Sequence, residues 1–348
     1  PLINCSAIEI MKLHRFVREA EGNELSELET YPIIEQISKM KLMPCEIDIG
    51  EMVVHLLVNK NLDAEHYVNK MLESQQRTKR SYPLRPKDVV LYGFGRIGRL
   101  LTRILVSDTG AGIKWRVRAV VVRDSNHEDD LIKRASLLRN DSVHGTFPGT
   151  IRVNKNNNSL IVNGNEIFFI NSNDPRKVNY KQYGIKKATL IDNTGAWTDE
   201  EGLNQHIKNP SVDKVILTAP AKGKIKNIVF GINDERLKEE EKIVGAASCT
   251  TNAITPPLRL IDEAYKIQSG HIETIHAYTN DQNLVDNYHK SDRRGRSAAL
   301  NLVITDTGAA KAVSDVIPEL KGKLTANAIR VPTPNVSLAI MNLNLKKS

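Results

Sequence analysis

Residues 88–99 read Asp-Val-Val-Leu-Tyr-Gly-Phe-Gly-Arg-Ile-Gly-Arg, an apolar run followed by three glycines at the spacing G-x-G-x-x-G. The run Asp88–Tyr92 is typical of a short buried strand, and Ile97–Val106 has the apolar spacing of a helix. A strand, a Gly-rich turn and a helix in this order favour dinucleotide binding, because a pyrophosphate can approach the backbone at the helix N-terminus. The segment therefore predicts the first strand and helix of an α/β nucleotide-binding domain.

Each glycine of this turn has its own expected role. Gly93 permits the tight turn, Gly95 lets a pyrophosphate approach the backbone, and Gly98 allows the helix to pack closely on the sheet. The next strand, Val117–Val122, is followed by Asp124, whose carboxylate would accept hydrogen bonds from the adenosine ribose. A Gly-rich turn that binds no ligand is the alternative interpretation.

Short runs of Val, Ile and Leu continue beyond this unit, as a parallel sheet buried on both faces requires. We expect strands at Ala188–Asp192, Lys214–Thr218, Asn227–Phe230 and Lys242–Val244. Longer strands are expected nearer the C-terminus, at His271–Tyr278, Asn327–Val331 and Val336–Leu345. The predicted fold class is α/β: a Rossmann-type parallel-sheet domain, then an α+β domain.

The first 80 residues differ from the rest, with few strand signals and apolar residues at helical spacing. We expect a small helical extension at 1–80 and a linker at 81–87, within the polar stretch Gln75–Lys87. A dinucleotide-binding domain is expected at 88–247 and a catalytic domain at 248–348.

Cys249 and His276 are the candidate catalytic pair. The segment after Cys249, to about Tyr265, is predicted to be a helix, so the thiol would lie at a helix N-terminus, where its thiolate is favoured. His276 is expected near the end of a strand, where its imidazole could serve as base and ion-pair partner of the sulfur. A buried Cys and an unrelated His are the alternative.

Composition restricts the class of protein. The chain has 348 residues and three widely spaced cysteines, Cys5, Cys45 and Cys249, which do not form a disulfide framework and favour a reducing, cytoplasmic compartment. No apolar run approaches the ~18 residues of a membrane span. The net charge is +8, with the first 80 residues acidic and the remainder basic, which suits small phosphates and dinucleotides. No basic block with interleaved aromatic residues indicates a nucleic-acid surface.

Further motifs follow the Gly-rich turn in a fixed order. They are Tyr-Gly-Phe-Gly-Arg-Ile-Gly-Arg (92–99), Asp-Ser-Val-His-Gly (141–145), Asp-Asn-Thr-Gly (192–195), Thr-Ala-Pro (218–220), Ala-Ser-Cys-Thr-Thr-Asn (247–252), Asp-Arg-Arg-Gly-Arg (292–296), Thr-Gly-Ala-Ala-Lys-Ala-Val (307–313) and Arg-Val-Pro-Thr-Pro-Asn-Val-Ser (330–337). From about Asp88 to Leu345 the chain resembles the phosphorylating glyceraldehyde-3-phosphate dehydrogenases. Residues 1–80 lie outside this resemblance.

The resemblance implies a set of site residues. Those implied to bind NAD are Gly93, Phe94, Gly95, Arg96, Ile97, Gly98, Asp124, Thr194, Gly195 and Thr218. Those implied to bind the attacking phosphate are Ser248, Thr250, Thr307 and Gly308, and those on the substrate-phosphate side are Thr279, Asp281, Arg293 and Arg330. Cys249 would form a thiohemiacetal and then a thioester with glyceraldehyde 3-phosphate, His276 would move the protons, and inorganic phosphate would release 1,3-bisphosphoglycerate.

Several alternatives stay open. Asp124 favours NAD, whereas Arg123 and the polar pair Asn287-Tyr288 leave NADP possible. An erythrose-4-phosphate dehydrogenase, with water as acyl acceptor, is a related activity. A binding or regulatory protein, whose acidic extension recruits a partner, is a different class. The resemblance also implies a homotetramer, and because family members continue beyond Leu345, we expect the sequence to be incomplete at its C-terminus.

Overall fold

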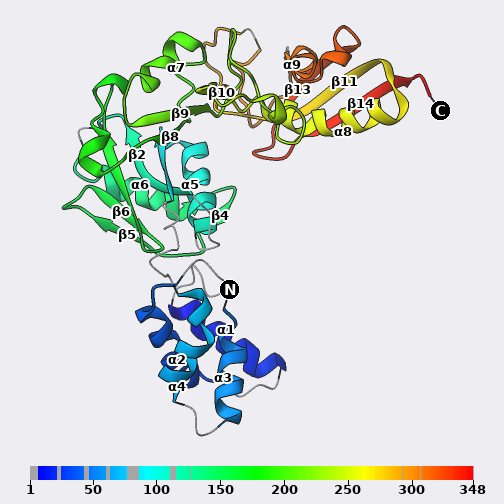
Figure 1. Ribbon diagram of the computed structural model, residues 1–348. Coiled ribbons are helices and arrows are strands. Elements are labelled where there is room, and N and C mark those ends of the chain that lie inside the picture. The colour runs from blue at the N-terminus through cyan, green and yellow to red at the C-terminus, as the bar shows by residue number, and fades with distance from the viewer. Residues whose placement is uncertain are drawn as a thin grey trace. The chain divides into compact units, whose positions relative to one another are not determined.

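The computed structural model describes residues 7–21, 25–42, 47–59, 63–76, 86–109, 115–125, 127–291, 293–305 and 307–347. The chain divides into two compact units. The first comprises Pro1–Asp141 with Gly145–Thr189, and the second comprises Ser142–His144 with Leu190–Ser348. Figure 1 shows helices only in the N-terminal part of the first unit and mixed helices and strands thereafter.

The N-terminal part contains four helices, α1 (Ala7–Glu21), α2 (Glu27–Lys39), α3 (Ile49–Val58) and α4 (Ala64–Met71), with a short 3₁₀ turn at Glu73–Gln75. Aspartates cap the N-termini of α3 and α4, where Asp48 accepts from the Glu51 N–H at 2.9 Å and Asp63 from the His66 N–H at 2.9 Å. They enclose a core of their own, formed by Leu25, Ile33, Met52, Val53, Tyr67, Val68 and Leu72. Of the predicted linker, residues 81–85 lie outside the described residues.

The remainder of the first unit is a sheet with helices. Its strands lie in the order β1 (Lys87–Tyr92), β2 (Trp115–Val122), β7 (Asn165–Asn171), β6 (Ser159–Val162) and β5 (Ile151–Asn154). The first three are parallel, and β5–β7 form an antiparallel meander. Helices α5 (Arg96–Thr109) and α6 (Asp130–Arg139) follow β1 and β2, and the two-residue strands β3 (Asn140–Asp141) and β4 (Gly145–Thr146) pair antiparallel. The parallel strand–helix alternation confirms the predicted Rossmann-type α/β class.

The alternation continues with β8 (Ala188–Asp192), whose first two residues belong to the first unit, and then in the second unit with α7 (Glu200–Ile207), β9 (Val212–Leu217) and β10 (Ile243–Gly245). The predicted strand Asn227–Phe230 is wrong, since the segment makes only an isolated bridge between Asn227 and Gly245. Side chains replace a ladder there: Asn227 bonds the backbone of Ala221, and Asn233 accepts from the Val229 N–H at 2.8 Å. The run is therefore a loop held by two asparagines.

A four-stranded sheet and two helices form the rest of the second unit. The strand order is β12 (Val303–Thr305), β13 (Leu324–Val331), β11 (Ile267–Ala277) and β14 (Leu338–Leu345), with β11 and β13 parallel. Helix α8 (Cys249–Tyr265) precedes β11, and α9 (Ala309–Val316) precedes β13. Strand β14 begins two residues later than predicted, because Val336 has a left-handed φ of 68° that ends extended pairing.

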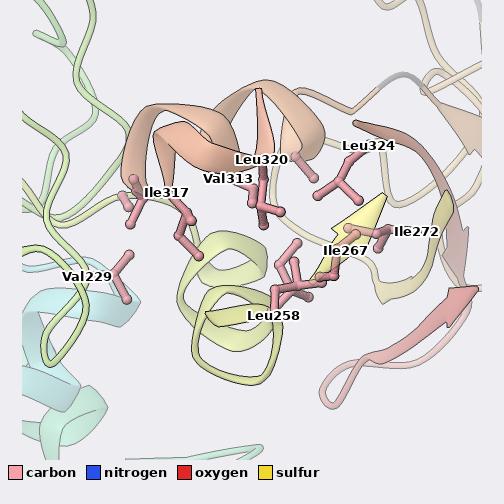
Figure 2. Close-up of a cluster of buried hydrophobic side chains, with 12 residues drawn as sticks. Val229, Leu258, Ile267, Ile272, Val313, Ile317, Leu320 and Leu324 are labelled. Carbon is pink, nitrogen blue, oxygen red and sulfur yellow. The ribbon is translucent and has the colours of Figure 1, made fainter. Parts of the chain in front are cut away.

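Figure 2 shows the apolar cluster between α8, α9 and the sheet. Leu258 of α8, Ile272 of β11 and Val313 of α9 are each fully buried. Burying a side chain of this size stabilises the fold by about 1.5–3 kcal/mol. The cluster therefore fixes the three elements whose ends carry Cys249, His276 and Gly308. Among the described residues, no helix is long and apolar enough to cross a bilayer.

Candidate active site

Helix α8 begins at Cys249, as the sequence predicts. Ser248 is its N-cap: the Ser248 hydroxyl accepts a hydrogen bond from the Thr251 N–H at 3.0 Å and lies 2.7 Å from the Thr251 hydroxyl. Ala247, immediately before the cap, has a φ of 57°, a left-handed conformation that costs a non-glycine residue roughly 1–2 kcal/mol. The sharp turn brings the thiol to the exposed first position of the helix.

The Cys249 sulfur lies 3.3 Å from Nε2 of His276. The hydrogen bond with His276 is the largest cause that lowers the pKa of Cys249 to about 7, with a smaller contribution from Thr250 and against the effect of burial. The same contact raises the pKa of His276 above its ordinary value. Both shifts favour a thiolate beside an imidazolium, which is the reactive form of a nucleophilic cysteine.

Arg330 reaches this pair through the strand register, because His276 of β11 lies opposite Arg330 of β13. Its Nη1 is 2.6 Å from His276 Nδ1 and 2.9 Å from the Ala277 carbonyl oxygen, while His276 Nδ1 is 2.7 Å from that oxygen. Arg330 can donate to Nδ1 of the neutral ring, and in the imidazolium the Nδ1–H donates to Ala277 instead. The guanidinium charge opposes the imidazolium and lowers the pKa of His276, although the contact with Cys249 outweighs it.

These groups surround one cavity of about 290 Å³ in the second unit. Of the predicted residues, its lining contains Cys249, His276, Ser248, Thr250, Thr307, Gly308 and Arg330. Thr274 and Thr305 also line it, and neither was expected from the sequence. Gly308 lines the cavity and is the N-cap of α9, so the N-terminus of that helix lies at the cavity wall.

Thr279, Asp281 and Arg293 do not line this cavity, and all three are exposed. Asp281 forms a short ion pair with Arg294, which also donates from Nε and Nη2 to the Thr305 hydroxyl at 3.1 and 2.7 Å. Arg293 instead approaches the Ile304 carbonyl at 3.5 Å. Burial is the largest cause that lowers the pKa of Arg330, and the charge of Arg294 lowers it further. Arg294, which was not expected from the sequence, does not line the cavity itself, but it is the arginine of this loop that contacts the lining residue Thr305 through its side chain.

The Gly-rich turn lies in the first unit, between β1 and α5. Gly93 has a φ of 96° and its N–H donates to the Val121 carbonyl at 2.9 Å, so a side chain at this position would be strained. A Cβ placed on Gly95 would meet nothing within 4 Å, which leaves open space above the backbone. Gly98 is buried. The turn therefore has the room and the helix N-terminus that a dinucleotide phosphate requires.

The side chains of this turn differ in orientation. Phe94 is buried and packs edge-on against Phe169, with ring centroids 5.0 Å apart, so only its backbone is available to a ligand. Arg96 opens α5 and Ile97 is exposed. Asp124 is exposed two residues after β2, at the same sheet edge as Gly93 because β1 and β2 are parallel. The turn and the acid predicted to bind the ribose thus lie at the edge where the motif predicts them.

The other predicted cofactor residues belong to the second unit. Asp192 is buried and holds two of them in place. Its Oδ1 accepts hydrogen bonds from the N–H and the hydroxyl of Thr194, both at 2.7 Å. Its backbone carbonyl accepts from the N–H and the hydroxyl of Thr218 at 3.0 and 3.1 Å. His206 Nε2 lies 3.1 Å from Asp192 Oδ2. Gly195 follows with a φ of 66°, which only glycine adopts without strain.

Known protein families match both the region of the Gly-rich turn and the region of the catalytic cavity. The family model described as the NAD binding domain of glyceraldehyde 3-phosphate dehydrogenase matches residues 87–200, and the C-terminal domain model of the same enzyme matches 248–348. A glyceraldehyde-3-phosphate dehydrogenase-like protein of Pseudomonas aeruginosa (strain UCBPP-PA14) is 56% identical over 350 residues, which covers 100% of this chain and 76% of the relative.

Two further relatives are similar over part of the chain. Glyceraldehyde-3-phosphate dehydrogenase 1 of Bacillus cereus is 41% identical, over 73% of this chain and 72% of its own length. The chloroplastic glyceraldehyde-3-phosphate dehydrogenase B of Pisum sativum is 42% identical, over 74% of this chain and 55% of its own length. The relative from Pseudomonas is therefore the one of these three whose similarity includes the N-terminal helices.

Proposed function

Because the chain belongs to the glyceraldehyde-3-phosphate dehydrogenase family of NAD-dependent dehydrogenases, we propose that it reversibly oxidises D-glyceraldehyde 3-phosphate to 1,3-bisphosphoglycerate. The single observation that carries the proposal is the Cys249–His276 pair, 3.3 Å apart, in a cavity whose wall includes Thr307 and Gly308. Dinucleotide binding is assigned to residues 88–247 and catalysis to 248–348.

Cys249 is the nucleophile. Its thiolate attacks the aldehyde carbon, a C–S bond forms, and the carbonyl oxygen becomes the oxyanion of a thiohemiacetal. The Cys249 N–H, at the first position of α8 and outside the intrahelical ladder, and the imidazolium Nε2–H are the available donors for that oxygen. The imidazolium passes its Nε2 proton to that oxygen to make the hydroxyl, and the neutral His276 then takes this proton back as the C–H bond of the thiohemiacetal breaks. When bound, NAD(P) supplies the acceptor for the hydride.

A thioester on Cys249 needs an acyl acceptor. Ser248, Thr250, Thr307 and Gly308 line the catalytic cavity and offer hydroxyls and N–H groups at two helix starts, which suits an attacking phosphate. Attack of a phosphate oxygen on the thioester carbon breaks the C–S bond and regenerates the thiolate. This lining favours phosphate over water, and hence the phosphorylating reaction over an erythrose-4-phosphate dehydrogenase.

The substrate's own phosphate requires a second anion site. Arg330 lines the cavity, and Arg294 is held beside it by Asp281 and Thr305. Two guanidinium groups on neighbouring elements can bind a phosphate through paired hydrogen bonds. We assign this site to Arg330 and Arg294. Thr279, Asp281 and Arg293 remain predictions at its rim.

The test is steady-state formation of NADH from glyceraldehyde 3-phosphate and NAD, with and without inorganic phosphate. The proposal expects turnover that depends on phosphate, that is slower with erythrose 4-phosphate, and that Cys249→Ser abolishes. Equal sustained rates with and without phosphate would support water as the acceptor instead. Absence of turnover in the folded, full-length protein would favour a binding or regulatory role. Light scattering tests the homotetramer that we propose for this chain.

A further inference from the structure

A second cavity, of about 770 Å³, adjoins the catalytic cavity within the second unit, and the mechanism leaves it unused. The two cavities share Pro220, Gly308 and Ala312 in their walls. One side of the second cavity is the loop from Pro220 to Asn227, and another is α9. Its volume falls in the range of pockets that hold a small organic ligand and is far larger than one phosphate ion needs.

The lining of this cavity is strongly cationic. Lys222, Lys224, Arg236 and Lys311 contribute positive charge, while Asp315 is the carboxylate among the described lining residues. In the part of the chain that the structure describes, none of these four cations is found in an ion pair, and all four are exposed. Lys226, a fifth cation, is already engaged, with its Nζ 2.8 Å from Glu241. The cavity thus keeps an excess of positive charge that neighbouring acids do not neutralise.

The loop that carries two of these lysines is held in place by its own hydrogen bonds. The Asn227 side chain accepts from the Ala221 N–H at 2.8 Å and donates to the Ala221 carbonyl at 3.0 Å, which ties the two ends of the loop together. Gly223 lies between Lys222 and Lys224 with a φ of 75°, where a non-glycine residue would be strained. An anion would therefore meet lysines on a preformed loop, and its binding would not have to order that backbone.

We propose that this cavity binds a small anion with two or more phosphoryl groups. Four unpaired cations against one carboxylate select for high negative charge, and the volume selects for a ligand larger than orthophosphate. Lys ammonium groups recognise such a ligand as point charges, without the fixed fork geometry that Arg imposes. This site is distinct from the catalytic cavity, and the proposal does not depend on the reaction proposed above.

The experiment measures binding of inorganic tripolyphosphate to the full-length protein by calorimetry, with NAD present in saturating amount so that the nucleotide site is occupied. The double variant Lys222→Glu/Lys224→Glu should raise the dissociation constant roughly tenfold or more, because it replaces two attractive charges by repulsive ones. Asp315→Asn should tighten binding, since it removes the lining carboxylate. Lys321→Glu, at an exposed lysine outside the lining, should change binding little.

Three results would overturn the proposal. The first is no binding to the wild-type protein at low ionic strength, where electrostatic attraction is least screened. The second is an equal loss in Lys321→Glu, which would mean that overall charge and not the cavity attracts the anion. The third is a loss in Arg330→Lys with full binding in Lys222→Glu/Lys224→Glu, which would place the anion in the catalytic cavity. Thermal unfolding of each variant controls for misfolding.

Discussion

The Cys249–His276 contact makes a pH-dependent prediction at the scale of single residues. Iodoacetamide should alkylate Cys249 with an apparent midpoint at a pH of about 7, because the pKa of the thiol is lowered to that value. Below the midpoint the thiol is protonated and alkylation slows. His276→Asn removes the main cause of the low pKa, so the midpoint should move upward.

The measurement needs a background of Cys5→Ser and Cys45→Ser, so that Cys249 is the single thiol. His276→Asn should also lower the turnover rate by about 10²–10⁴-fold, the usual contribution of a positioned acid–base group. An unchanged alkylation midpoint together with near-normal turnover would remove His276 from the mechanism.

Asp124 makes the prediction for cofactor choice. Its carboxylate should hydrogen-bond the ribose diol of NAD and repel the 2′-phosphate of NADP. Asp124→Ala should therefore weaken NAD binding and reduce the ratio of NAD affinity to NADP affinity. Arg123 would then be available to bind the 2′-phosphate of NADP. Fluorescence titration of both nucleotides against wild type and variant checks this. A wild-type preference for NADP would contradict the assignment.

Some of the candidate site residues could be predicted from the sequence and others could not. Cys249, His276 and the Gly-rich turn could be predicted, because a helix start, a strand end and a strand–turn–helix unit are local patterns. Arg294 could not be distinguished from its neighbour Arg293. Arg294 is the one of the two that pairs with Asp281, and it also contacts Thr305. These partners are distant in sequence, so local pattern does not distinguish the two arginines.

At the scale of elements, the register of β11 against β13 brings Arg330 beside His276. Arg330→Lys should raise the KM for glyceraldehyde 3-phosphate roughly tenfold or more, since a hydrogen bond to a charged group contributes about 1.5–3 kcal/mol. The same substitution should raise the KM for a non-phosphorylated aldehyde far less. Arg294→Lys should behave similarly, whereas Arg293→Lys is the matched control on the exposed side of the loop.

Equal losses with phosphorylated and non-phosphorylated aldehydes would contradict this prediction, because they would indicate that Arg330 acts on His276 or on stability and not on the substrate phosphate. A large effect of Arg293→Lys would support the prediction that Arg293 also binds the substrate phosphate.

Some helices and strands could likewise be predicted from local pattern, and others could not. Runs such as Val117–Val122 become strands because every side chain except that of Arg118 finds a buried place on one of two covered faces. The apolar run at Asn227–Phe230 fails to do so, since the amides of Asn227 and Asn233 satisfy the backbone of a loop. An apolar pattern indicates that a segment is buried. Nearby polar side chains decide whether its backbone groups form hydrogen bonds with a neighbouring strand or with those side chains.

At the scale of the whole molecule, the helical extension and the catalytic machinery have separate cores. Leu25, Ile33 and Val68 belong to the cluster of the extension, whereas Leu258 and Val313 belong to that of the second unit. Deletion of residues 1–80 should therefore leave the catalytic rate within about twofold, because no catalytic group or part of their supporting core is removed. Loss of turnover in a deletion variant that remains folded by circular dichroism would show that the extension takes part in catalysis.

We propose that Cys249 carries an acyl group during turnover and that inorganic phosphate removes it. Mass spectrometry of the full-length protein, after reaction with glyceraldehyde 3-phosphate and NAD without phosphate, tests it most directly. We predict a 3-phosphoglyceroyl adduct on the peptide that contains Cys249, which disappears on addition of phosphate and never forms in Cys249→Ser. An adduct on another residue, or one that phosphate does not discharge, would contradict acyl transfer through Cys249.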